Sequence, residues 1–206
     1  MNTTTAAEWN QHYIDGSTPW DNNTPDTQLQ RVFAEYKIAP CRTLELGCGT
    51  GTNAVFLAER GFDVTAFDVS TLALEQAQAR ASAAQVKIHF FEASVFELPD
   101  LGGPFPLVFD RGVYHCARRQ GAKPLCEAIA RQSAAGGWYF TLAGNAQEPH
   151  DPNLGPPRLT AKEIVDDFSP WFDLVELREG RFDPVLIEGQ LVQPLAWSAL
   201  WRRKTS

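Results

Sequence analysis

The chain has 206 residues, of which 44% are apolar, and it carries a formal net charge of -7 at pH 7. A chain of this length buries a sizeable core, and its negative charge, without any Lys/Arg-rich block, excludes association driven by nucleic-acid phosphates. No apolar run approaches the roughly 18 residues that span a bilayer, so we expect no membrane partner.

Apolar positions at helical spacing alternate along the chain with short β-rich runs. The first clear helix pattern comprises Leu29, Val32, Phe33 and Tyr36, after a proline-bounded loop at 19–25. The sequence then predicts strands at 43–46, 63–67, 86–91, 105–109, 138–142, 172–177 and 195–201. Between the strands it predicts helices at 53–60, 72–84, 124–134 and 161–168.

This alternation predicts an α/β, Rossmann-like fold with a mostly parallel sheet and helices on both faces. Neither an internal repeat nor a linker divides the sequence. Residues 1–206 are therefore predicted to form a single domain, in which residues 1–40 are an N-terminal helical segment.

The first predicted strand leads into a loop with three alternate glycines, G-C-G-T-G at 47–51. In open parallel sheets, such a loop forms the floor of the ligand site. A dinucleotide loop reads G-x-G-x-x-G, but here Thr52 takes the place of the third glycine, which disfavours a nicotinamide-dependent oxidoreductase. Glu45 lies near the same floor, where a carboxylate repels phosphate and attracts a cation. These features favour S-adenosylmethionine, which carries an ammonium group and no phosphate.

Asp68 ends the second predicted strand, where a carboxylate can accept both hydroxyl hydrogens of a ribose. The alternative is that Asp68 or Ser70 caps the following helix. In combination with Glu45 and the glycine loop, the ligand interpretation of Asp68 is favoured.

The stretch 44–70, LELGCGTGTNAVFLAERGFDVTAFDVS, resembles the cofactor-binding half of class I S-adenosylmethionine-dependent methyltransferases. Three more stretches, WNQHYIDGSTPWD, FDRGVYH and RLTAKEIVDDFSPWFDLVELRE, are similar to the thiopurine, thiol, halide and tellurite methyltransferase group. The resemblance implies seven strands, the last of them antiparallel, and a methyltransferase that uses S-adenosylmethionine. It also implies cofactor contacts from Trp20, Glu45, Gly47, Cys48, Gly49, Asp68, Val69, Ser94, Val95 and Asp110.

The contact to the adenine is the weakest part of this resemblance. Related proteins often carry Asp at the position of Ser94, where it accepts from the adenine amino group. A serine hydroxyl accepts less strongly, so the backbone of Val95 is the alternative contact.

The stretch after the fourth strand, 110–115, lies where the methyl group should face its acceptor. A phenol or other hydroxyl acceptor needs a general base, and His115 is the best-placed one, although a structural role is an equal alternative. Arg111 either neutralises an anionic acceptor or pairs with Asp110. A thiol needs little beyond alignment, so sulfur is favoured over a phenolic or heteroaromatic O- or N-acceptor. Substrate contacts are predicted from Tyr13, Trp20, Tyr114, His115 and His150.

Trp9 and Trp20 flank a polar, proline-bounded segment ahead of the sheet. Exposed aromatic residues in such a segment indicate that it closes over a ligand. We therefore predict that residues 1–40 include a lid that contains Trp20 and Tyr13; a structural clasp is the alternative.

The four cysteines form no C-x-x-C pair and have no histidine at metal-ligand spacing, which predicts reduced thiols, no metal and a cytoplasmic location. The N-terminus lacks the basic and apolar segments of a secretory leader. The expected partner is a small-molecule acceptor, and the expected state is a monomer or weak homodimer. A non-catalytic S-adenosylmethionine-binding protein remains an alternative.

Overall fold

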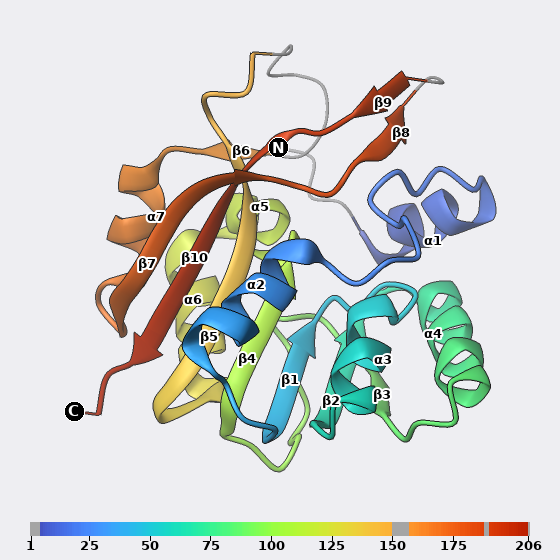
Figure 1. Cartoon of the computed structure of the whole chain (residues 1–206), viewed down its shortest axis with the longest axis horizontal. Helices are drawn as coiled ribbons and strands as arrows, with labels where there is room; N and C mark the ends of the chain where they lie inside the picture. The colour runs from blue at the N-terminus through green and yellow to red at the C-terminus, as the bar shows by residue number, and fades with distance from the viewer. Residues whose placement is uncertain (1–4, 150–156, 188–189, 206) are drawn as a thin grey trace.

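The computed structural model describes residues 5–149, 157–187 and 190–205, and a twisted mixed sheet lies at its centre (Figure 1). The strands of the main path follow the order β3-β2-β1-β4-β5-β10-β7. In chain order these strands are β1 (Arg42–Leu46), β2 (Asp63–Asp68), β3 (His89–Glu92), β4 (Phe105–Arg111), β5 (Ser133–Asn145), β7 (Phe172–Arg181) and β10 (Leu195–Arg203).

The strands from β3 to β5 run parallel, and β10 runs antiparallel to both of its neighbours, β5 and β7. The predicted mostly parallel sheet with an antiparallel last strand is thus confirmed. The sequence did not indicate the two-residue β6 (Arg158–Leu159), which pairs with β5, or the hairpin of β8 (Val185–Ile187) and β9 (Gln190–Val192).

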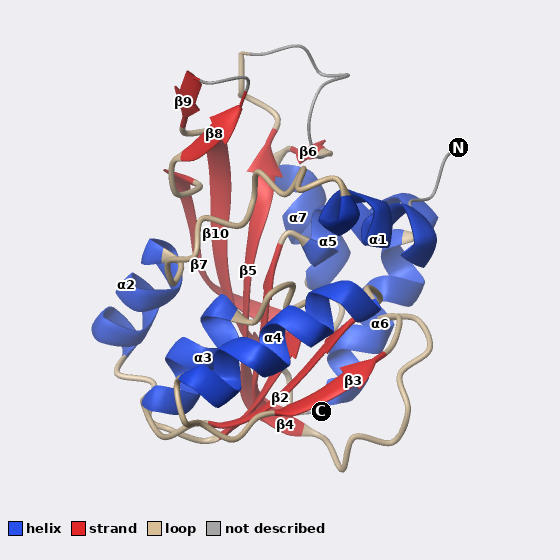
Figure 2. Ribbon diagram, turned by 90° about the vertical axis from the view of Figure 1, so that its right-hand side faces the viewer, coloured by secondary structure: helices blue, strands red, loops and turns tan. Residues whose placement is uncertain are grey.

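Helices cover both faces of the sheet, as predicted (Figure 2). One face packs against α2 (Thr27–Tyr36), α3 (Thr52–Glu59) and α4 (Thr71–Ala83). The opposite face packs against α5 (Val113–Ala117), α6 (Ala122–Gln132) and α7 (Ala161–Phe168). The remaining helix, α1 (Ala6–Ile14), lies beside α4, and a 3-10 turn, Arg118–Gln120, follows α5.

Local chemistry explains where the elements differ from the prediction. β3 begins later than expected because Gln85 adopts a φ of 55° and the Val86 N–H bonds back to Ala81, so these residues end α4. α6 begins before Pro124, which is tolerated in the first turn of a helix because its missing N–H has no intrahelical partner there. The predicted capping box of α7 is confirmed at Thr160 and Glu163.

The alternation of side chains along β1 determines the chemistry at its end. Leu44 and Leu46 point into the core under α5, α6 and α7. Glu45, between them, points to the other face, where Asn53 of α3 contacts its carboxylate. The strand thus directs one carboxylate to the start of the glycine loop.

Phe168 lies at the centre of an aromatic cluster between α7 and the sheet, with ring centroids at 4.7 Å from Tyr114, 5.0 Å from Tyr139 and 5.5 Å from Trp201. We expect Phe168→Ala to lower the free energy of unfolding by about 3–5 kcal/mol, because the fully buried ring leaves a cavity. Chemical denaturation monitored by circular dichroism measures this loss. The control, Phe91→Ala at a residue that is 37% exposed on the edge strand β3, should cost less than about 1 kcal/mol.

Candidate functional site

The glycine loop between β1 and α3 has a backbone that favours glycine at each alternate position. Gly47, Gly49 and Gly51 have φ angles of 59°, 53° and 78°. A Cβ on Gly47 would lie 2.2 Å from a methyl carbon of Val113, and one on Gly51 would lie 2.9 Å from Ala77. The loop is therefore packed tightly against α5 and α4. The buried Cys48 within it donates its backbone N–H to the carbonyl of Phe67 at 2.9 Å.

Glu45 is the buried carboxylate at the base of this loop and is only 3% exposed. Its side chain interacts with the Asn53 amide, but its Oε2 atom is buried without a hydrogen-bond partner among the described residues. Burial, with the negative charges of Asp68 and Asp110, raises its pKa well above the usual range. A carboxylate with these neighbours is best stabilised by a cation.

Asp68 connects the end of β2 to the glycine loop. Its Oδ2 accepts the Gly49 N–H at 2.8 Å, and its Oδ1 accepts the Ser70 N–H at 2.9 Å. Ser70, rather than Asp68, is the N-cap of α4, since the Ser70 hydroxyl accepts the Ala73 N–H. Val69, between them, is partly exposed.

The turn after β3 contains the two predicted adenine contacts. The Ser94 hydroxyl accepts the Phe96 N–H at 3.3 Å, and the Val95 side chain is buried. The Ser94 hydroxyl therefore stabilises its own turn.

At the end of β4, the surroundings of Asp110 and Tyr114 differ from those that the sequence predicted. Asp110 is fully buried and accepts bonds from the Tyr139 hydroxyl at 2.7 Å and the Tyr114 N–H at 3.0 Å. The Tyr114 side chain is also fully buried, and its hydroxyl donates to Asp167 of α7 at 2.6 Å. The structure thus places Tyr114 in the core rather than on the expected substrate surface, because Asp167 provides its hydroxyl with an acceptor there.

Arg111, predicted to meet the acceptor or Asp110, instead contacts the N-terminal segment. Its Nε donates to the buried carboxylate of Asp26 at 2.8 Å, and a terminal nitrogen donates to the Trp20 carbonyl at 3.1 Å. Its guanidinium also lies over the ring of Phe182, 5.2 Å from the centroid. Arg111 therefore joins the end of β4 to residues well before the sheet.

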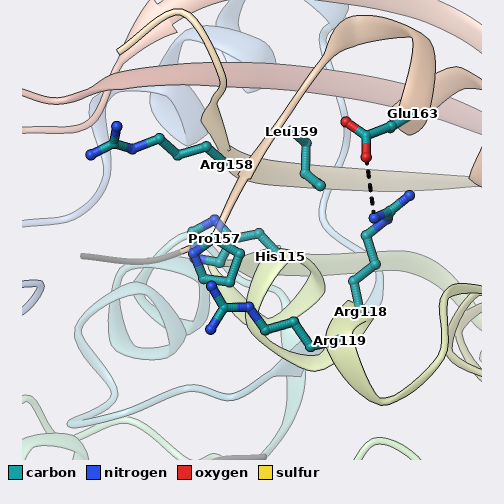
Figure 3. A pocket seen from close by; sticks show the side chains of 7 residues that line it. All are labelled: His115, Arg118, Arg119, Pro157, Arg158, Leu159 and Glu163. Atoms are coloured by element: carbon teal, nitrogen blue, oxygen red, sulfur yellow. Dashed lines mark ion pairs between the residues drawn. The ribbon is translucent and has the colours of Figure 1, made fainter. Parts of the chain in front are cut away.

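His115 is 4% exposed, and its Nδ1 accepts the Gly144 N–H of β5 at 2.7 Å. Burial, with the positive charges of Arg111 and Arg119, lowers its pKa to about 3. The imidazole is therefore neutral at pH 7, and the bond to Nδ1 places its proton on Nε2. A pocket of about 280 Å³ adjoins this ring (Figure 3), lined by His115, Arg118, Arg119, Pro157, Arg158, Leu159 and Glu163.

Aromatic side chains of the N-terminal segment lie over the glycine loop. The Tyr13 hydroxyl is 3.2 Å from the position that a Cβ on Gly49 would take. Burial and the charge of Asp68 raise the pKa of Tyr13, and its ring packs against Trp20, which in turn packs edge-on against Trp9. The predicted lid residues Tyr13 and Trp20 are thus next to the predicted cofactor residues.

Two hydrogen bonds connect the same segment to the ends of the strands. The Ser70 hydroxyl donates to Asn10 Oδ1 at 2.6 Å. The Thr50 hydroxyl donates to Asp21 Oδ2, also at 2.6 Å. The segment therefore contacts the chain after β1, after β2 and, through Arg111, at the end of β4.

The residues of this region that were not singled out from the sequence include Asn53, Asp26 and Arg119. Asp26 carries the signal of a helix N-cap, which the structure shows through its bonds to the Gln28 and Leu29 amides. His150, a predicted substrate contact, lies outside the described residues.

Comparisons with known proteins agree with this geometry. Residues 43–137 match the methyltransferase domain family. The chain is 27% identical over 144 residues to probable thiol methyltransferase 2 of Arabidopsis thaliana. This match covers 69% of the chain but only 63% of the Arabidopsis protein. The chain is also 25% identical over 163 residues to 2-heptyl-1-hydroxyquinolin-4(1H)-one methyltransferase of Mycobacteroides abscessus. This match covers 74% of the chain and 71% of that protein.

A solved structure from work on the conversion of a disulfide bond into a thioacetal group during echinomycin biosynthesis has the same fold. It has a TM-score of 0.80 at 22% identity and covers 91% of this chain and 86% of its own. Residues 43–137 thus resemble a methyltransferase domain, in agreement with the resemblance to class I S-adenosylmethionine-dependent methyltransferases predicted from the residues at 44–70. Among the helices of the described ranges, none has the length and apolar character of a bilayer span.

We expect Glu45→Gln to stabilise the ligand-free protein and to weaken cofactor binding. The folded state holds the Glu45 proton to a higher pH than the unfolded chain, so this group contributes less stability as pH rises above about 4.3. The neutral glutamine removes that loss, and the gain in melting temperature should be larger at pH 7 than at pH 4.5. Calorimetry should show S-adenosylhomocysteine binding weakened by about 1.5–3 kcal/mol.

The matched control is Glu59→Gln, an exposed residue at the end of α3. It makes the same charge change and should alter neither the pH dependence of stability nor the affinity. A Glu45→Gln protein that bound as tightly as the wild type would contradict a cation contact at this carboxylate.

The contacts of the N-terminal segment predict that it becomes more protected when cofactor binds. Hydrogen exchange of residues 9–27 should slow on addition of S-adenosylhomocysteine, because ordering over the ligand protects these amides. Peptides from α6, on the other side of the sheet, provide the internal control. If exchange is identical with and without ligand, the lid prediction is wrong and the segment has only the structural role of a clasp.

Proposed function

We propose that this protein transfers the methyl group of S-adenosylmethionine to a small-molecule acceptor, and that it prefers sulfur or another readily ionised nucleophile. One observation carries the proposal: the buried Glu45 Oε2 has no hydrogen-bond partner in the described structure and lies at the base of a loop that has glycine at 47, 49 and 51. An ammonium group provides the missing partner.

The residues at the ends of the first two strands fit this cofactor. Glu45 would accept from the amino group, and Gly47 and Gly49 would allow the ligand to approach the backbone. Each Asp68 oxygen accepts one backbone N–H and retains a lone pair for a ribose hydroxyl. S-adenosylmethionine supplies an electrophilic methyl group, and the chain aligns the two reactants and excludes water.

The chemistry of His115 supports the preference for an easily ionised acceptor. Its Nδ1 is engaged by the Gly144 N–H, and its pKa of about 3 makes it a poor base. An alcohol or weakly acidic phenol would need that base, whereas a thiol near its own pKa of about 8.5 reacts as the thiolate. The name of the Arabidopsis relative refers to thiols.

The alternative is a hydroxyl acceptor, which the name of the Mycobacteroides abscessus relative supports because it specifies a hydroxyquinolinone. Formation of S-adenosylhomocysteine across a panel of thiols, phenols and N-heterocycles distinguishes these acceptors. A protein that binds the cofactor but forms no product with any acceptor would be a non-catalytic binder.

We expect His115→Asn to retain the rate on thiols within about tenfold, because asparagine can still accept the Gly144 N–H. The wild-type rate on thiols should follow ionisation of the acceptor and show no inflection near pH 6.5, since His115 is already neutral. A loss of about 10²- to 10⁴-fold in this variant, with an inflection near pH 6.5, would instead identify His115 as a general base.

A further inference from the structure

The pocket beside His115 is connected to the glycine loop through α5. Val113, at the start of α5, fills the space above Gly47, and the same short stretch continues to His115 and Arg119. At a rise of about 1.5–2 Å per residue, Arg119 lies roughly 10 Å along the helix from Val113. A molecule that extends from this pocket along α5 would thus need to span about 10 Å to reach the residues at the glycine loop.

The lining of this pocket is basic, although the whole chain is acidic. Arg118 is neutralised by Asp167 at 2.6 Å and by Glu163 at 3.4 Å, and Figure 3 shows it turned toward Glu163. Arg119 is exposed and has no hydrogen bond or ion pair within the described residues. Arg158, whose guanidinium donates to the Glu148 carbonyl at 3.2 Å, adds a third positive charge.

His115 adds a neutral donor to this lining. Its Nδ1 is used by Gly144, so its N–H is on Nε2, which has no hydrogen-bond partner within the described ranges. The charge of Arg119 acts on the same imidazole. Arg119 and His115 thus line one pocket, and a guanidinium together with an N–H donor is a combination that binds carboxylates and other oxyanions.

We propose that the methyl acceptor carries an anionic group, a carboxylate or similar oxyanion, that the Arg119 guanidinium and the His115 Nε2–H bind in this pocket. This inference rests on the proposed methyltransferase function and specifies its substrate class. The net charge of -7 repels an anionic acceptor at long range. The acceptor is therefore held by the local positive charge of Arg119. The anionic group serves as an anchor at the pocket, while the nucleophile of the same molecule faces the cofactor.

The test compares two isosteric thiol probes, 4-mercaptobenzoate and 4-mercaptobenzamide, which differ only in the carboxylate charge, on protein saturated with S-adenosylhomocysteine. Calorimetry should show at least tenfold tighter binding of the carboxylate by the wild type. Arg119→Gln should reduce that preference about tenfold and leave the affinity for the amide unchanged, and Arg119→Glu should abolish the preference. The control Arg131→Gln removes one charge from an exposed position on α6 and should keep the wild-type preference.

Equal affinity of the wild type for the two probes would overturn the anion site. So would an equal loss of carboxylate binding in Arg119→Gln and Arg131→Gln, because the effect would then be one of net charge. Methyl transfer to the amide probe is measured separately. If that transfer occurs while the carboxylate preference is absent, the proposed function stands and the anion site fails. If the carboxylate binds through Arg119 but neither probe is methylated, the site stands and the proposed function fails for these acceptors.

Discussion

Three neighbouring parallel strands each place a carboxylate at or near the same end of the sheet, and the cost of burying these groups shapes the rest of the structure. Burial raises the pKa of Glu45, Asp68 and Asp110 alike. Two of them are compensated internally, Asp68 by backbone N–H groups and Asp110 by a tyrosine hydroxyl and an N–H. Glu45 is compensated only in part. The fold therefore retains one destabilising group at the position where we propose that a positively charged ligand binds. Such a ligand would remove the cost of burying Glu45, and this exchange of stability for function is common in proteins.

The N-terminal segment is organised around the same end of the sheet. A buried pair, Arg111 with Asp26, joins β4 to the cap of α2, and Asp26 also accepts the first amides of that helix. Breaking one partner of such a pair leaves an uncompensated buried charge, so the pair holds the segment in a defined position. Tyr13 and Trp20 can then lie over the glycine loop in a fixed orientation. The position of the N-terminal segment therefore depends on the contacts that it makes with the end of β4.

Features set by local sequence were predictable, and features set by distant contacts were not. The order of strands and helices, the glycine loop and the cap of α7 follow from spacing and residue type. The partner of Arg111 is distant in sequence from it, and no local pattern links the two. The state of His115 depends on an amide of β5, and Tyr114 is drawn into the core by Asp167 of α7. The first half of β5 was also missed, because Ala134, Gly136 and Gly137 have little strand propensity. Gly136 has a φ of 68°, and the register with β4 shifts between the Phe105–Ser133 and Leu107–Trp138 pairs.

The position of β10 has a consequence for how the chain folds. This strand is the last of the sheet in sequence, yet it lies between β5 and β7 and bonds to both along most of its length. Until it inserts, β5 and β7 each present a long row of unpaired backbone groups, which is the kind of edge that recruits other chains. Completing the sheet is therefore a late, non-local event, and such topologies form slowly. A chain still being synthesised would hold its cofactor half in place while the other half of the sheet stays open to chaperones or to misassembly.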